Sequence, residues 1–320
     1  MFDLLDVLKD TNSIGISGHI RPDGDCVGST MATYMYLTKM FQEKKIDIFL
    51  EPIPDAYSCI ARLDEVRTDF ATDVDSYDAF IVIDCDYTRT GQAQSYFENA
   101  KLKINVDHHI SNTGCGDINY IVPIASSACE LVFDLIGEEG LDEDIALALY
   151  LGIIHDCGVF QYSNTSPKTL ETAAKLIPFG FDFSKIIEET FYQKTYMQNL
   201  LLGKAVTDSK LILDGHSIYS VISKQVMDEY NAKSSDLDGI VNQLRNTKGV
   251  DCAIFMYELE DGGYKISMRS NEKVNVSAIA KKFGGGGHIK AAGVTMDGTV
   301  EEIVSKLSDL IEEQLKLLKA

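Results

Sequence analysis

Three short segments of this chain carry side chains of the types that commonly bind metal ions. Each of these segments follows an apolar, strand-like stretch. They are His19-Ile-Arg-Pro-Asp23-Gly-Asp25, Asp84-Cys-Asp86 and Asp107-His108-His109. A fourth acidic residue, Asp156, follows the apolar run 145–154. Because a pair of cations can bind both the attacking and the leaving oxygen of a phosphoryl group, this set predicts a phosphoesterase that uses water as its nucleophile.

The first segment combines one imidazole with two carboxylates in a single loop. His19, Asp23 and Asp25 lie at offsets 0, +4 and +6, and Pro22 and Gly24 shape the turn between them. Imidazole suits transition metals and carboxylates suit magnesium or manganese, so the mixed set favours manganese over calcium. The alternative is an ordinary turn, since Asp-Gly-Asp is also a common turn sequence.

The other two segments suggest different roles for their members. Asp84 ends an apolar strand, where an unpaired carboxylate would be costly, and is therefore the best candidate to bridge two metal ions. The adjacent His108 and His109 point in different directions, so one can bind metal while the other meets the substrate. Asp107 can orient an imidazole from behind the ligands. A buried structural histidine pair is the alternative.

Asp156 follows a helix of apolar residues and needs a partner for the same reason as Asp84. Three other residues near these segments or elsewhere in the chain have simpler interpretations. Asp86 can be a turn acid, His155 is expected in the core or beside the ligands, and His216 is expected at the surface of a hairpin turn.

A glycine-rich segment in the second half of the chain predicts an anion site. Its consecutive glycines are Gly284, Gly285, Gly286 and Gly287. Such glycines let backbone N–H groups approach an anion closely, and His288 and Lys290 add positive charge. Basic residues outnumber acidic ones by six to one between residues 264 and 290. We therefore favour a phosphate- or nucleotide-binding loop over a flexible loop or a solvated basic face.

The elements that must position these residues alternate between strand and helix in the first half of the chain. This alternation predicts an α/β fold with a doubly wound, mostly parallel sheet. The expected strands are 13–18, 45–50, 79–84 and 103–107, and the expected helices begin near residue 28 and span 125–136 and 142–154. Ligands of such sheets collect outside the carboxyl ends of the strands, so one crevice can gather the predicted residues.

The second half predicts a smaller α/β substrate-binding domain. Its expected elements are a hairpin over 211–222, two strands over 251–259 and 263–270, and a helix over 277–283. The expected division is a metal-binding phosphoesterase domain at 1–185, a connecting helix at 186–208 and a substrate-binding domain at 209–320.

Composition narrows the class of protein. The formal net charge of −20 should repel a long nucleic-acid duplex, because non-specific affinity for duplexes comes mostly from Lys and Arg. The longest apolar run has ten residues, about half of a bilayer span, and the first residues lack the basic region of a secretory signal. We therefore expect a cytoplasmic protein without a membrane partner.

Cysteine usage agrees with that expectation. Seven cysteines without a Cys-x-x-Cys pair argue against a disulfide framework. Cys26, Cys85 and Cys157 directly follow proposed metal ligands and are expected to be small buried residues. The alternative is that oxidants or soft metals inactivate the site through these thiols.

In this order the motifs resemble the DHH phosphoesterase superfamily, named for the triplet that stands here as Asp107-His108-His109. The resemblance covers nearly the whole chain, because Arg269-Ser270 and Gly-Gly-Gly-Gly-His-x-x-Ala-Ala-Gly are similar to the DHH-associated substrate domain. Size and layout resemble the nanoRNase and pAp-phosphatase (oligoribonuclease) group. That group trims very short oligonucleotides to mononucleotides, and close relatives hydrolyse cyclic dinucleotides or their linear products.

The resemblance implies two divalent metal ions, Mn²⁺ in the first place, and a role for each matching residue. The implied ligands are His19, Asp23 and Asp84 for one ion, and Asp25, Asp84, His108 and Asp156 for the other. The implied catalytic group is Asp84, Asp107 and His109, with His109 on the scissile phosphate. The implied contacts to the far phosphate or terminal nucleotide are Arg269, Ser270, His288 and the backbone of Gly284–Gly287.

The expected activity is hydrolysis of very short oligonucleotides to mononucleotides and of pAp to AMP. The substrate domain would hold the far end of the ligand, which favours short substrates. Alternatives are a cyclic or linear dinucleotide phosphodiesterase, a manganese pyrophosphatase and a non-catalytic nucleotide sensor. The sequence does not decide among these substrates, and it leaves a homodimer open.

Overall fold

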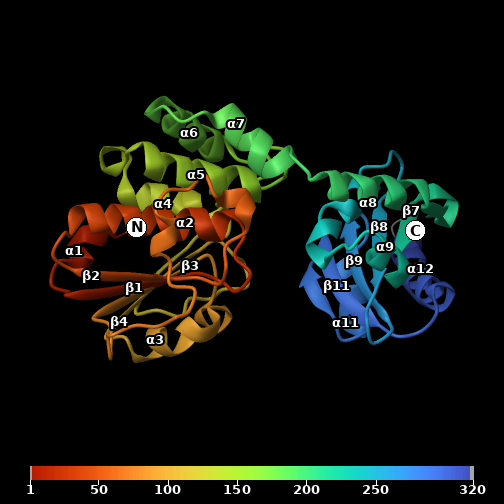
Figure 1. Cartoon of the computed structure of the whole chain (residues 1–320), viewed down its shortest axis with the longest axis horizontal. Coiled ribbons are helices and arrows are strands. Elements are labelled where there is room, and N and C mark those ends of the chain that lie inside the picture. The colour runs from red at the N-terminus through yellow and green to blue at the C-terminus, as the bar shows by residue number, and fades with distance from the viewer. Residues whose placement is uncertain (1, 318–320) are drawn as a thin grey trace. The chain divides into compact units, whose positions relative to one another are not determined.

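The computed structural model describes residues 2–317, except for the side chain of His288. The chain divides into two compact units, Met1–Gln193 and Lys194–Ala320 (Figure 1). The helices of the described residues do not include one with the length and apolar composition needed to cross a bilayer.

The sheet of the first unit is entirely parallel. Within the described residues it has five strands, in the order β2-β1-β3-β4-β5. The strands are β1 (Ser13–Ser17), β2 (Lys45–Phe49), β3 (Ala79–Ile83), β4 (Leu102–Asp107) and β5 (Ile118–Ile121). Alternate residues of β3 face two separate cores, because the strand is buried on both sides. The prediction of a doubly wound parallel sheet is confirmed.

Helices cover both faces of this sheet, with α2, α4 and α5 on one side and α3 on the other (Figure 1). The helices of the unit are α1 (Leu4–Leu8), α2 (Gly24–Met40), α3 (Gln94–Asn99), α4 (Ala128–Ile136), α5 (Glu143–Asp156), α6 (Pro167–Leu176) and α7 (Phe183–Ile187). Helix α2 is buried along most of its length because it lies between the sheet and α5. At Gly28 a Cβ would collide with the carbonyl oxygen of Ala148, so glycine allows α2 and α5 to approach closely.

The segment expected to form one connecting helix is interrupted. Helix α7 continues into a π-helical turn, Glu188–Tyr192, and Gln193 is extended. A new helix, α8 (Tyr196–Thr207), then begins. The break follows from a capping box, in which Thr195 and Gln198 each bond the backbone N–H of the other.

The second unit contains a mixed sheet whose described strands follow the order β10-β11-β9-β8-β7-β6. Its strands are β6 (Lys210–Ile212), β7 (Ser217–Ile222), β8 (Cys252–Glu258), β9 (Tyr264–Ser270), β10 (Gly286–His288) and β11 (Ala291–Met296). Among the described strands of this second sheet, only β7 and β8 pair in parallel. The further helices are α9 (Lys224–Glu229), α10 (Ile240–Arg245), α11 (Val276–Lys282) and α12 (Val300–Leu317). Helices α8 and α10 pack on one face of the sheet, and α11 and α12 on the other.

The glycine-rich segment is only partly a loop, because Gly284 and Gly285 precede a strand that begins at Gly286. Residues Gly286–His288 pair with Ala291–Gly293 of β11, so the segment forms a hairpin at the edge of the sheet. A sequence of consecutive glycines carries no alternation of polar and apolar side chains, which is the pattern that identifies a strand.

Candidate metal centre

The predicted metal-binding residues come together at the carboxyl edge of the parallel sheet. His19 follows β1, Asp84 follows β3 directly, and Asp107 is the last residue of β4. Asp156 is the last residue of α5 and reaches the same place from the helical layer. The structure therefore joins residues that are up to 137 positions apart in the sequence (156 − 19).

Asp84 lies between the imidazole of His19 on one side and those of His108 and His109 on the other. Its Oδ2 is 3.4 Å from Nε2 of His19, while its Oδ1 is 3.4 Å from Nε2 of His108 and 3.6 Å from Nδ1 of His109. The residue is 2% exposed, and its φ of 64° lies in the left-handed region that non-glycine residues seldom adopt. The backbone is thus held in a strained conformation that directs one carboxylate at both groups.

The Oδ1 atom of Asp84 is buried and has no hydrogen-bond partner among the described residues. A buried carboxylate oxygen without a donor is unfavourable unless a cation binds it. The surrounding donors are carboxylate oxygens and imidazole nitrogens, which are ligands that manganese and other divalent first-row ions accept. The residues at this position therefore fit a metal ion.

The first donor group surrounds His19. Its Nδ1 lies 2.9 Å from the carbonyl oxygen of Ile20, which directs Nε2 toward Asp23 Oδ1 at 3.7 Å and toward Asp84. Asp23 Oδ1 also accepts from the backbone N–H groups of Asp25 and Cys26 and so caps α2. The Cys26 sulfur lies within 4.8 Å of the donor atoms of His19 and Asp84.

The second donor group surrounds His108. Its Nε2 is 3.7 Å from Asp25 Oδ2 and 3.6 Å from Asp156 Oδ2, in addition to its contact with Asp84. Both oxygens of Asp25 accept backbone N–H groups at the start of α4, from Ala128 at 2.6 Å and from Cys129 at 2.9 Å. The positive end of a helix thus stabilises this carboxylate.

The pKa values show an excess of negative charge at the centre. Burial alone would lower the pKa of His108, but Asp84, Asp25 and Asp156 outweigh it and raise that pKa to about 10. Burial raises the pKa of Asp156 to about 6, against the opposing effect of His108. Burial also raises the pKa of Asp25 above its usual value, and Asp84 adds to this. Carboxylates packed this closely attract a cation.

Asp107 orients His109. Its Oδ1 lies 2.8 Å from Nδ1 of His109 and accepts the backbone N–H groups of His108 and His109. Its Oδ2 accepts from Nδ2 of Asn112 at 2.6 Å, and the same amide contacts Oδ1 of Asn105 at 2.9 Å. Asp107 is fully buried, and both of its oxygens are engaged by groups that fix the His109 ring.

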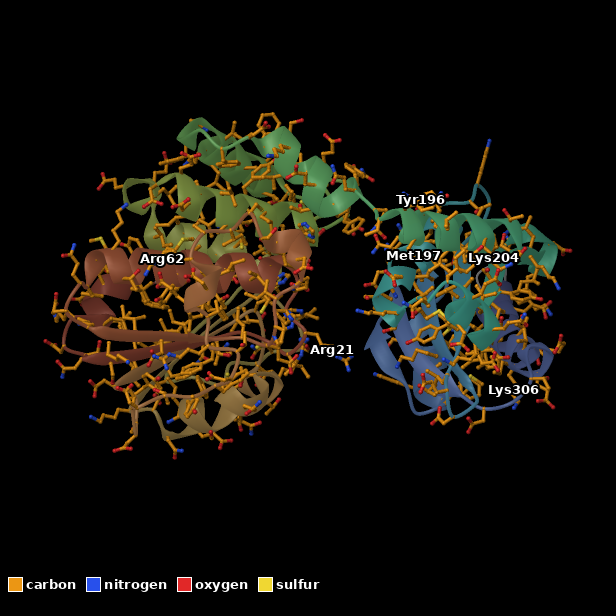
Figure 2. All side chains as sticks on the ribbon, viewed as in Figure 1. Arg21, Arg62, Tyr196, Met197, Lys204 and Lys306 are labelled. Atoms are coloured by element: carbon orange, nitrogen blue, oxygen red, sulfur yellow. The ribbon has the colours of Figure 1, made fainter. Side chains whose placement is uncertain are left out.

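Sequence reasoning did not identify three groups that support the ligands. They are the N-terminal N–H groups of α4, Asn112 behind Asp107, and Asn164, whose Nδ2 is 3.4 Å from Asp156 Oδ2. The only local sequence signal for the N–H groups of α4 is Ser127, a favourable N-cap directly before this helix. Arg21, whose φ is 55° and whose exposed side chain points out of the unit, adds a positive charge to the His19–Asp25 segment (Figure 2).

The residues with simpler interpretations have partners of their own. Oδ1 of Asp86 accepts the N–H of Thr88 and caps a short 3-10 helix, as a turn acid does. His155 pairs with Thr190. Cys26, Cys85 and Cys157 are buried thiols outside any disulfide, and burial raises the pKa of Cys26 and of Cys157 to about 11.

In the second unit, the predicted substrate residues lie on neighbouring strands. Arg269 of β9 pairs with Ala291 of β11, and Ala291 pairs with His288 of β10. Paired residues share one face of a sheet, so positions 269, 291 and 288 form a row on one face. The His288 side chain lies outside the described part of the chain. Ser270 is buried and its hydroxyl donates to the carbonyl oxygen of Val274 at 2.5 Å.

Comparisons with known proteins agree with this two-unit arrangement. The DHH family, N-terminal domain, matches residues 13–153, and the DHHA1 domain matches residues 216–317. A crystal structure of an exopolyphosphatase-related protein from Bacteroides fragilis superposes with a TM-score of 0.90 at 25% identity, covering 98% of this chain and 96% of that one.

Two curated relatives are similar over almost their full length. The bifunctional oligoribonuclease and PAP phosphatase NrnA of Bacillus subtilis (strain 168) is 28% identical, over 97% of this chain and 98% of the relative. The probable bifunctional oligoribonuclease and PAP phosphatase NrnA of Streptococcus mutans is 27% identical, over 99% of this chain and 98% of the relative. The chain contains a DHH domain at residues 13–153, followed by a DHHA1 domain at residues 216–317.

Proposed function

We propose that this protein is a manganese-dependent phosphoesterase that hydrolyses very short oligonucleotides to mononucleotides and pAp to AMP. The observation that carries this proposal is Asp84, whose two oxygens face separate donor groups and whose Oδ1 is buried without a hydrogen-bond partner among the described residues. The curated relatives named for oligoribonuclease and PAP phosphatase activity support the choice of substrate.

We assign one metal ion to His19, Asp23 and Asp84, and the other to Asp25, Asp84, His108 and Asp156. When bound, two such cations stabilise the charge that develops on a phosphoryl group and make water a stronger nucleophile at neutral pH. Mixed imidazole and carboxylate donors favour manganese over calcium or magnesium. Two N–H groups of α4 donate to Asp25 and favour its charged form, against the burial that raises its pKa.

The residues of the chain then orient the substrate around this centre. Asp107 engages Nδ1 of His109, so we assign the other ring nitrogen to a hydrogen bond with the scissile phosphate. Asn112 holds Asp107 from behind and keeps the ring in one orientation. A fixed donor at this point stabilises charge without a cost of reorganisation during the reaction.

The far end of the substrate is assigned to the second unit. Arg269 and His288 lie in one row across β9, β11 and β10, and the Gly284–Gly287 backbone lies beside them. This arrangement suits a single phosphate or terminal nucleotide. Ser270 is assigned a supporting role, because its hydroxyl is used within the fold.

The test is hydrolysis of a matched substrate panel in the presence of Mn²⁺. It contains pApA, a five-nucleotide RNA, a long RNA, pAp, cyclic di-AMP and pyrophosphate, with the Asp84→Ala protein as the blank. Rapid release of mononucleotide from pApA and of AMP from pAp, with long RNA spared, is the expected result. Activity confined to cyclic di-AMP or pyrophosphate would overturn the substrate, and turnover of none of them would favour a nucleotide sensor.

A further inference from the structure

His155 directly precedes Asp156 at the end of α5, yet it lies outside the donor groups that the described residues form around Asp84. Its ring instead contacts three other segments of the first unit. These are the loop that carries Asp23 and Asp25, the π-helical turn Glu188–Tyr192, and the residues around Tyr57.

The first contact is with Gly24. An ideal Cβ at this position would lie 2.6 Å from Cγ of His155 and 2.7 Å from its Cβ, distances that real Cβ atoms do not reach. The ring therefore packs directly on the backbone of the residue between Asp23 and Asp25. A shift of the ring would remove one of the contacts that hold the backbone carrying these two carboxylates.

The second contact is a hydrogen bond whose direction can be assigned. Nε2 of His155 is 2.9 Å from the hydroxyl oxygen of Thr190. The same hydroxyl donates its one proton to the carbonyl oxygen of Ile186 at 2.7 Å. It must therefore accept from His155, so Nε2 of the imidazole carries a proton. Thr190 is the middle residue of the π-helical turn, a conformation that is rare and often found at functional sites.

The third set of contacts fixes the plane of the ring. Tyr57 meets His155 edge to face at a centroid distance of 5.1 Å, and Phe191 does so at 5.5 Å. With Gly24 and Thr190, these neighbours restrict the orientation of the imidazole. The ring thus ties the π-helical turn, which ends one residue before Gln193, to the backbone of the first metal-binding segment.

We propose that His155 is a positioning residue that couples the turn Glu188–Tyr192 to the metal-binding segment Asp23–Asp25 and thereby sets the metal affinity of the centre. This inference rests on the proposed metal centre. Its consequence is reciprocal: if ordering of the turn strengthens metal binding, then metal binding must order the turn to the same degree.

The first experiment measures Mn²⁺ affinity by calorimetry on EDTA-treated, repurified protein. His155→Phe keeps a ring on Gly24 but removes the donor, and Thr190→Val keeps the shape of the side chain but removes the acceptor. Each is expected to weaken binding about 10-fold, the low end of the effect of residues that support metal ligands. His155→Gln restores a donor near the same position and should recover part of the affinity.

Thr207→Val is the matched control. Thr207 lies in α8 and its hydroxyl also donates to the carbonyl oxygen four residues earlier, Gly203, at 2.8 Å. Its replacement removes the same kind of helical hydrogen bond without touching an imidazole and should leave Mn²⁺ affinity unchanged. Thermal unfolding of each metal-free variant shows whether the protein remains folded.

The second experiment measures amide hydrogen exchange of the turn, including the N–H of Gln193, which bonds the carbonyl oxygen of Glu188 at 2.7 Å. Mn²⁺ should slow this exchange in the wild type and in Thr207→Val, but not in His155→Phe or Thr190→Val. A purely structural role for His155 would change the exchange rate equally with and without metal, and that result would refute the coupling.

The outcomes separate this inference from the proposed function. If the wild type binds Mn²⁺, Asp84→Asn does not, and His155→Phe and Thr190→Val bind as the wild type does, the positioning role is refuted and the metal centre stands. If the wild type binds no Mn²⁺, the metal centre is refuted and the coupling with it.

Discussion

At the scale of the residue, Asp84 combines burial, backbone strain and an unsatisfied oxygen. Its φ of 64° is costly for a residue with a side chain, although Asp and Asn tolerate this region better than other residues. Its Oδ1 is buried among carboxylates and imidazoles without a donor from the described residues. Such features cluster at functional sites because a fold gains no stability from them.

Asp84→Asn should therefore separate function from stability. Asparagine keeps the backbone conformation but removes the charge, so turnover should fall at least about 100-fold. Loss of one group that stabilises the charge of the transition state has an effect of this size in other enzymes. The fold should survive because the two side chains have the same shape, although the metal-free variant loses the attraction between Asp84 and His108. Thermal unfolding with and without Mn²⁺ measures this, since a bound ligand stabilises only a protein that binds it. Mn²⁺ should raise the Tm of the wild type but not that of the variant, and an equal rise in both would contradict the role of Asp84.

At the scale of the element, strand ends were more predictable than the contacts between helices. The apolar runs identify β1, β3 and β4, and a parallel sheet gathers their carboxyl ends, so the grouping of His19, Asp84 and Asp107 follows from pattern and topology. Helix α2 begins four residues earlier than expected, because Asp23 both caps the helix and faces His19.

Other contacts of these elements could not be read from the sequence. The N–H groups of α4 that bind Asp25 come from residues 103 and 104 positions away. The contact between the His155 ring and Gly24 likewise depends on how α5 packs against α2. No local pattern encodes such contacts, because they arise only when separate helices pack together.

Gly28→Ala tests the approach of α2 to α5. The added Cβ would collide with the carbonyl oxygen of Ala148, so the variant should lose about 1–3 kcal/mol of stability, as overpacked cores do. Mn²⁺ affinity should also fall, because Asp25 and Asp156 lie on these two helices. Gly203→Ala in α8 is the control: a Cβ there meets no atom within 4 Å and should stabilise the helix by about 0.5–1 kcal/mol. Urea denaturation measures both, and equal stabilities would refute the role of Gly28.

At the scale of the whole molecule, charge and chemistry are distributed unevenly. The chain carries a formal net charge of −20, yet residues 264–290 of the second unit are basic. An acidic protein disfavours long polyanions, whereas a confined basic segment can still bind one phosphate. This contrast is readable from the sequence, but the row formed by positions 269, 291 and 288 depends on strand register, which consecutive glycines do not reveal.

Arg269→Ala should weaken substrate binding with little effect on the chemical step. A hydrogen bond to a charged group contributes about 1.5–3 kcal/mol, which corresponds to a rise in KM for pApA of about 10- to 150-fold. Lys306→Ala is the control, because this exposed cation of α12 also belongs to the second unit (Figure 2). Steady-state kinetics measure KM and kcat of both variants. An unchanged KM with a reduced kcat for Arg269→Ala would place Arg269 in the chemical step instead.

The most direct test of the two-metal phosphoesterase is a Mn²⁺ titration of EDTA-treated protein, with release of AMP from pApA as the readout. We expect no turnover without metal, a rise that saturates when two ions are bound per chain, and turnover by Asp84→Asn at least about 100-fold below that of the wild type at every concentration. Full hydrolysis by the metal-free protein, or saturation with a single ion, would contradict it.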